Sequence, residues 1–77
     1  MSKLPVLAFR RIDQVLRHLG FEQKRQKGSH IFYRHPDGRT TTVPFHKGRD
    51  ITRPLLREIL REIEIEPEVL EHILSEI

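Results

Sequence analysis

The spacing of apolar residues changes twice along this chain, and that change limits the folds it can adopt. From Ala8 to Leu19 apolar side chains recur every three or four residues, as on one face of an α-helix: Phe9, Ile12, Val15, Leu16 and Leu19. Between Phe21 and Val43 the helical spacing is lost, and β-branched and aromatic runs alternate with Gly and Pro turns. Helical spacing returns at Leu55. The sequence therefore predicts helices on both sides of a β segment.

Two tight turns divide the β segment into three strands. We expect a polar, edge-like strand over 21–27, which Phe21 anchors, and a second strand over 30–34 after Gly28-Ser29. The run His35-Pro36-Asp37-Gly38 is typical of a type I turn, with Pro second and Gly fourth. A third strand follows over 40–43. Short connections between consecutive strands predict an antiparallel meander.

The remainder of the chain predicts a loop and two further helices. Residues 45–51 are expected to form the loop, and Thr52 is a suitable N-cap for a helix whose apolar face runs from Leu55 to Ile63. A break at 65–67 precedes a short third helix. The order α-β-β-β-α-α predicts a two-layer α+β fold in which helices cover one face of the sheet and the other face stays open. With 77 residues the chain forms a single domain, residues 1–77.

Charge is distributed unevenly around a modest net value of +3. Up to Arg53 there are 12 Lys and Arg against 4 Asp and Glu, whereas the rest of the chain has 2 against 7. A basic body with an acidic tail indicates a polyanionic partner for the body, with nucleic acid the commonest candidate. A solubilised surface with an acidic amphipathic helix explains the charges equally well.

Cysteine is absent, which excludes disulfides and cysteine-ligated zinc and suits a reducing, cytoplasmic setting. The apolar runs are far shorter than the roughly 20 residues of a membrane span, and the first residues do not resemble a signal peptide. We therefore expect a cytoplasmic protein that does not enter a membrane.

The residues best suited to chemistry surround Gly28-Ser29-His30. Strand alternation places His30 on one face with Phe32 and Arg34, and the chain nearby is rich in cations: Lys24, Arg25, Lys27, Arg34 and Arg39. An imidazole acts as acid or base near neutral pH, which suits attack by a ribose 2′-hydroxyl on its own phosphate. Cations would hold that phosphate, Gly28 would let the backbone approach it, and Ser29 would donate a hydrogen bond. This chemistry requires no cofactor.

Other interpretations of the same residues exist. A polar histidine at the start of a strand needs no catalytic role, and a basic sheet can bind phosphates without cutting RNA. Small α+β domains bind duplex RNA by its shape in this way. A third possibility is a protein-binding domain that uses its strand edge or its acidic third helix. The five histidines lack the spacing of a metal motif, although His30, His35, His46 and Asp37 could converge through folding; we expect no metal site.

Five stretches of the chain, in order, resemble the HicA toxin family. They are Leu4-Pro5-Val6-Leu7, Leu19-Gly20-Phe21, Arg25-Gln26-Lys27-Gly28-Ser29-His30, Val43-Pro44-Phe45-His46 and Leu56-Arg57-Glu58-Ile59-Leu60. The resemblance covers about Leu4 to Ile65, and the combination of Gly-Ser-His with Val-Pro-x-His is its most specific part. Ala8, and Arg53-Pro54 before the second helix, depart from the family pattern without affecting Gly-Ser-His.

The resemblance implies a fold like that of the double-stranded-RNA-binding domain and the activity of an mRNA interferase in a type II toxin–antitoxin system. It implies that His30 is catalytic, that mRNA is the substrate and that a HicB-type antitoxin is the protein partner. His46 matches a second recurrent histidine of the family. We expect the RNA contacts to come from the basic strand, the turn and the following loop: Lys24, Arg25, Lys27, Gly28, Ser29, Arg34, His46 and Lys47.

Overall fold

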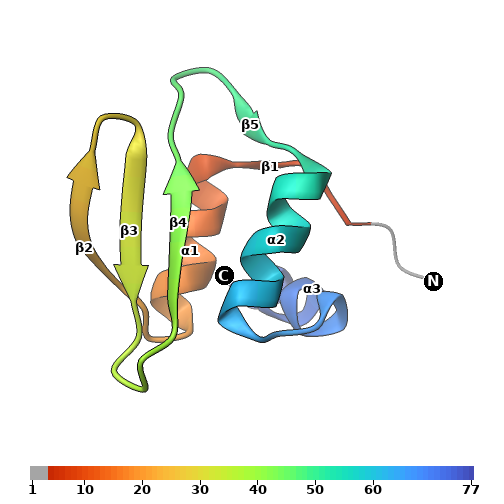
Figure 1. The fold of residues 1–77 in the computed structure, drawn as a ribbon. Helices are drawn as coiled ribbons and strands as arrows, with labels where there is room; N and C mark the ends of the chain where they lie inside the picture. The colour runs from red at the N-terminus through yellow and green to blue at the C-terminus, as the bar shows by residue number, and fades with distance from the viewer. Residues whose placement is uncertain (1–3) are drawn as a thin grey trace.

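A computed structural model describes residues 4–77 and contains a three-stranded antiparallel sheet with the order β2-β3-β4 (Figure 1). The strands are β2 (Glu22–Lys27), β3 (His30–Arg34) and β4 (Thr40–Pro44). The predicted meander is confirmed, with β3 as the central strand. Pro44 ends β4 at its last residue, as expected of a residue without a backbone N–H to continue the ladder.

Three helices complete the predicted order. They are α1 (Phe9–His18), α2 (Arg53–Ile63) and α3 (Pro67–Glu76). Ala8 and Thr52 occupy the N-cap positions of α1 and α2, but neither side chain makes a capping hydrogen bond. None of the helices between Leu4 and Ile77 is long and apolar enough to cross a membrane. The α+β class and its α-β-β-β-α order, the arrangement of a double-stranded-RNA-binding domain, are confirmed.

The helices lie on one face of the sheet, and strand alternation decides which side chains meet them. On β3, Ile31 and Tyr33 are buried, whereas His30 and Arg34 are exposed. Buried side chains of the helices pack in the same core as these strand residues: Ile12, Val15, Leu16, Leu56, Ile59, Leu60, Ile63, Leu70 and Ile73. The opposite face of the sheet carries the exposed set, so it is the open face that the pattern predicted.

A short second sheet differs from the expected loop. Leu7–Ala8 (β1) pairs antiparallel with Asp50–Ile51 (β5), with Leu7 opposite Ile51. The prediction of a loop was therefore wrong for its last two residues. A two-residue strand has too little alternation to be recognised, and its partner lies more than forty residues away in the chain. The pair holds the start of α1 beside the loop that follows β4 (Figure 1).

Helix α3 packs on its own domain, a point that the sequence left open. Leu70 and Ile73 are buried in the core. The guanidinium of Arg11 on α1 donates to the carbonyl oxygens of Leu74 at 3.0 Å and Ile77 at 3.4 Å. Carbonyls in the last turn of a helix have no partner within the helix, so Arg11 satisfies two that α3 would otherwise expose to water.

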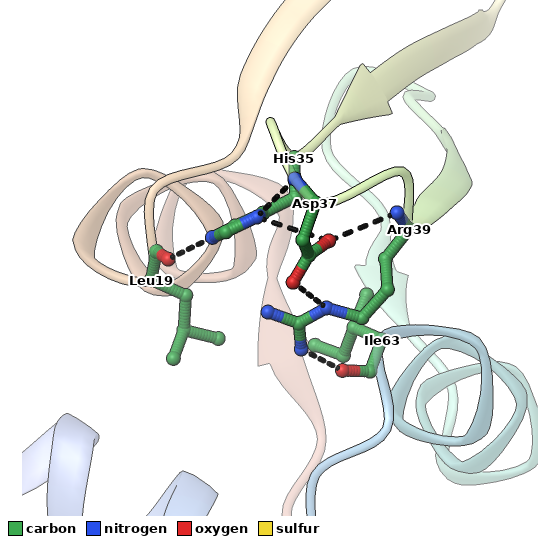
Figure 2. A network of polar contacts seen from close by, with 5 residues as sticks. All are labelled: Leu19, His35, Asp37, Arg39 and Ile63. Atoms are coloured by element: carbon green, nitrogen blue, oxygen red, sulfur yellow. Dashed lines mark hydrogen bonds and ion pairs between the residues drawn. The ribbon is translucent and has the colours of Figure 1, made fainter.

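The turn between β3 and β4 joins the C-terminal ends of α1 and α2 (Figure 2). His35 Nε2 lies 3.0 Å from the carbonyl oxygen of Leu19, and its Nδ1 accepts a hydrogen bond from the backbone N–H of Asp37 at 3.0 Å. The Asp37 carboxylate accepts from Arg39 Nε at 2.8 Å, and Arg39 also donates to the carbonyl of Ile63. The backbone N–H of Arg39 also donates to the Asp37 carboxylate, at 3.0 Å, and this bond, followed by the bond from the Arg39 side chain, lowers the pKa of Asp37. The network fixes the end of the sheet that lies away from His30.

Candidate functional site

The Gly28-Ser29 turn positions the candidate histidine. Gly28 has a φ of +59°, which glycine adopts without strain and which suits the first central position of a two-residue hairpin turn. The Gln26 side chain donates to the Gly28 carbonyl at 2.9 Å and closes the turn. The resulting register places His30 directly opposite Lys27 on β2 and opposite Pro44 on β4. Cross-strand partners share a face, so His30 and Lys27 stand together on the open face.

The loop that follows β4 is tied to this turn. The backbone N–H of Phe45 donates to the Ser29 carbonyl at 2.7 Å, and Ser29 is half-buried. His46 and Lys47 follow immediately and are exposed. Figure 1 shows the β2–β3 turn and this loop at the same end of the sheet. The structure therefore brings six predicted site residues to one end: Lys27, Gly28, Ser29, His30, His46 and Lys47.

The next cross-strand pair on the open face is Arg25 with Phe32, and it extends the site along the sheet. Arg25 lies opposite Phe32, and its guanidinium carbon is 4.6 Å from the centroid of the Phe32 ring. Phe32 is half-buried, unlike the core residues Ile31 and Tyr33 on either side. The sequence had placed Phe32 on the face of His30 without giving it a role.

Two predicted RNA contacts lie at the far end of the sheet. Arg34 is four residues from His30 on β3, about 14 Å at the rise of a strand. Lys24 falls at an irregularity in the pairing of β2 with β3, and its ammonium donates to Glu22 at 2.8 Å. That hydrogen bond lowers the pKa of Glu22. With His35 and Pro36, these residues line a pocket of about 280 Å³ that is separate from the Gly-Ser-His turn.

Arg39 does not join the cations around His30. Its side chain turns to the helical side, where it bonds Asp37 and the Ile63 carbonyl and lies 5.2 Å from the centroid of the Phe21 ring. Closeness along the chain therefore predicted more positive charge around His30 than the structure shows. Register, rather than separation along the chain, decides which cations share its face.

The histidines do not form a common metal site in the part of the chain that the structure describes. Within residues 4–77, no three His, Asp or Glu side chains come together in a way that could hold a metal ion. His35 uses both ring nitrogens in the network of Figure 2, whereas His30 and His46 are exposed at the other end of the sheet. His18 and His72 are exposed on α1 and α3.

Sequence reasoning missed two arginines beside His46. Arg10, at the start of α1, and Arg49, in the loop, line a pocket of about 420 Å³ together with His46, Phe9 and Phe45. The Phe9 and Phe45 rings pack at a centroid distance of 4.8 Å. No local pattern signals this grouping, because the unpredicted β1–β5 pair brings the two segments together.

Comparison with known proteins identifies the family. No curated protein matched the chain in a search of such proteins. A family model described as the HicA toxin of bacterial toxin–antitoxin systems matches residues 9–65. The match begins at the first residue of α1, includes the whole Gly28-Ser29-His30 turn and ends just past α2. It leaves out the acidic helix α3, which the resemblance seen in the sequence also left out. Because the match spans well over half of the 77 residues, the chain belongs to the HicA toxin family.

Proposed function

We propose that this protein is the toxin of a type II toxin–antitoxin system and that it inhibits translation by cutting mRNA as a metal-independent endoribonuclease. The observation that carries the proposal is the position of His30. It is exposed on the open face, directly opposite Lys27, at the end of the sheet where the Gly28-Ser29 turn meets the loop that carries His46. This position places an imidazole that can transfer a proton among groups that can bind a phosphate.

The chemistry balances without a cofactor. The ribose 2′-hydroxyl loses its proton and its oxygen bonds to the adjacent phosphorus, while the bond from phosphorus to the 5′-oxygen breaks and that oxygen takes up a proton. His30 serves one of the two proton transfers as general base or general acid. Lys27 and Arg25 hold the phosphate and stabilise the negative charge that develops on it. His46 is the second imidazole at this end of the sheet and the candidate for the other transfer.

Membership of a toxin–antitoxin family implies an antitoxin, and we propose a HicB-type protein that covers this face. Arg25, Lys27 and Arg34 make the face cationic, so an acidic region of the antitoxin would complement it. A small open reading frame next to this gene, whose product relieves growth inhibition, would support the pairing. An antitoxin that relieves inhibition without binding this face would contradict it.

Substitution of His30 tests the nuclease directly. General acid–base groups contribute roughly 10²–10⁴-fold to rate, so His30→Ala should lower the rate of RNA cleavage by at least about 10²-fold and abolish growth inhibition. The matched control is His18→Ala, since His18 is also exposed but lies on α1. Circular dichroism establishes that both variants are folded. Cleavage is measured in EDTA, and unchanged cleavage by His30→Ala would contradict the assignment.

The alternative is a module that binds RNA, including duplex RNA, without cutting it. The cationic open face favours this alternative as much as it favours a nuclease. It predicts a shift in RNA mobility with no product after long incubation, and binding that weakens steeply as salt rises. A single 2′-deoxy substitution distinguishes the two, because it removes the attacking hydroxyl and should block cleavage at that position while leaving binding nearly unchanged.

A further inference from the structure

The open face of the sheet carries an aromatic ring at its centre. Three side chains of β3 point to this face: His30, Phe32 and Arg34. Their cross-strand partners on β2 are Lys27, Arg25 and Glu22, and those on β4 are Pro44, Thr42 and Thr40. The set contains three cations, Lys27, Arg25 and Arg34, and one carboxylate, Glu22, and Phe32 is its only Phe, Tyr or Trp residue. The face suits an anionic ligand that also offers a flat apolar surface.

Phe32 has the surroundings of a ligand platform rather than of a core residue. Ile31 and Tyr33 are 5% and 1% exposed within the core, whereas Phe32 faces away from all three helices and is half-buried. The contact that covers its ring comes from Arg25, an exposed side chain on an edge strand, at 4.6 Å from the centroid. An exposed arginine over an aromatic ring is held weakly, so it can be displaced by, or can stack with, another flat group.

We propose that Phe32 is the platform on which one base of single-stranded RNA stacks, with Arg25 contacting the same nucleotide. This rests on the proposed function. Residues two apart on a strand lie roughly 7 Å apart, so a base on Phe32 places its backbone within reach of His30 and Lys27. Phe32 is therefore a positioning residue that brings the scissile phosphate to the histidine.

The same geometry favours single strands over duplex RNA. Every base has a π face that can stack on an aromatic side chain, whatever the sequence. In a duplex those faces are already stacked on neighbouring bases, and proteins contact the sugar and phosphate groups instead. An aromatic ring at the centre of a cationic sheet face therefore contributes to the binding of unpaired nucleotides and contributes little to the binding of a duplex.

Binding of RNA that cannot be cleaved tests the platform separately from catalysis. The probe is a short single-stranded RNA with 2′-O-methyl riboses, compared with the same strand annealed to its complement. Phe32→Leu keeps an apolar side chain but removes the ring, and should weaken single-strand binding about tenfold. Phe32→Trp should retain the affinity. Because the chain contains no tryptophan, stacking of a base on Trp would change a fluorescence signal that comes from this position alone.

Val69→Ala is the control. Val69 is 42% exposed on α3, in the helical layer and away from the open face, so this variant should change the affinity by less than twofold. The platform is supported if Phe32→Leu alone weakens binding, if the loss is the same at low and high salt, and if the duplex binds less tightly than the single strand. It is overturned if Phe32→Leu binds single strands like the wild type, or if only antitoxin binding weakens.

Different results would contradict the proposed stacking platform and the proposed nuclease activity. Wild-type protein that cleaves RNA through His30 but is indifferent to Phe32→Leu contradicts the platform and leaves the nuclease intact. Protein that binds single strands through Phe32 but cleaves none contradicts the nuclease and leaves the platform intact. In cleavage assays over RNA concentrations from below to above KM, Phe32→Leu should raise KM more than it lowers kcat, whereas His30→Ala should lower kcat.

Discussion

At the scale of single residues, Tyr33 shows how the helical side of the sheet is held. Its hydroxyl donates to Asp13 Oδ1 on α1 at 2.6 Å, and Arg17 donates to the other oxygen of the same carboxylate at 2.9 Å. Burial, together with the hydrogen bond to Asp13, raises the pKa of Tyr33 above its usual range. The residue thus joins the central strand to α1 through a polar contact within an apolar core.

Tyr33→Phe should lower the free energy of unfolding by about 1–2 kcal/mol at neutral pH, because Asp13 loses a donor at a partly buried position. Because the pKa of Tyr33 is raised in the folded state, the contribution of its hydroxyl to the free energy of unfolding is fully present below about pH 10, the ordinary tyrosine pKa. That contribution is lost as pH rises above it. Tyr33→Phe lacks this contribution, so the difference between the two proteins should shrink at high pH. Denaturant unfolding at neutral and alkaline pH measures it; a constant difference would contradict the prediction.

At the scale of elements, the end of α2 contains a strained residue. Glu64 has a φ of +59° and a ψ of +45°, and it is the one non-glycine residue with a positive φ in the described part of the chain. Residues with a Cβ are sterically destabilised in this left-handed conformation, and helices most often have glycine at this position, just past their last residue. A carboxylate at this end also opposes the helix dipole.

Glu64→Gly should therefore raise the free energy of unfolding by about 0.5–1 kcal/mol and Tm by roughly 2–6 °C. The control is Glu71→Gly, the same substitution at an exposed position within α3. There glycine should lower stability by about 0.5–1 kcal/mol, because it loses more backbone freedom on folding. Thermal unfolding followed by circular dichroism compares the two, and a loss of stability in both variants would show that the conformation of Glu64 is not strained.

At the scale of the whole molecule, charge is divided between the two layers. The open face of the sheet presents Arg25, Lys27 and Arg34, whereas the acidic residues of the tail belong to the helical layer. RNA should therefore bind from the sheet side. The strength of that binding should depend on salt, because each neutralised phosphate releases counterions.

Lys27→Gln should weaken binding of single-stranded RNA and reduce the slope of log K against log salt by about 0.7, the value for one phosphate contact. Arg57→Gln removes the same charge from α2, in the helical layer, and should leave the slope unchanged. Fluorescence anisotropy over a salt series with 2′-O-methyl RNA measures both. Equal slopes for Lys27→Gln and the wild type would show that Lys27 does not contact the backbone.

The local pattern of the sequence determined the three helices, the three strands of the main sheet and the residues that share a face with His30. Helical spacing and strand alternation are properties of neighbouring residues, so they identified these elements and grouped His30 with Phe32 and Arg34. The Gly28-Ser29 turn was recognisable for the same reason, since its conformation depends on the residues in the turn itself.

Only the tertiary structure decided which distant residues meet at the site. Register placed Lys27 opposite His30, left Lys24 and Arg34 at the far end and turned Arg39 to the helical side. The β1–β5 pair brought Arg10 to His46, and Arg11 fixed α3 on its own domain. These contacts depend on how elements far apart in the chain pack together. The spacing of apolar residues along the chain contains no information about that packing.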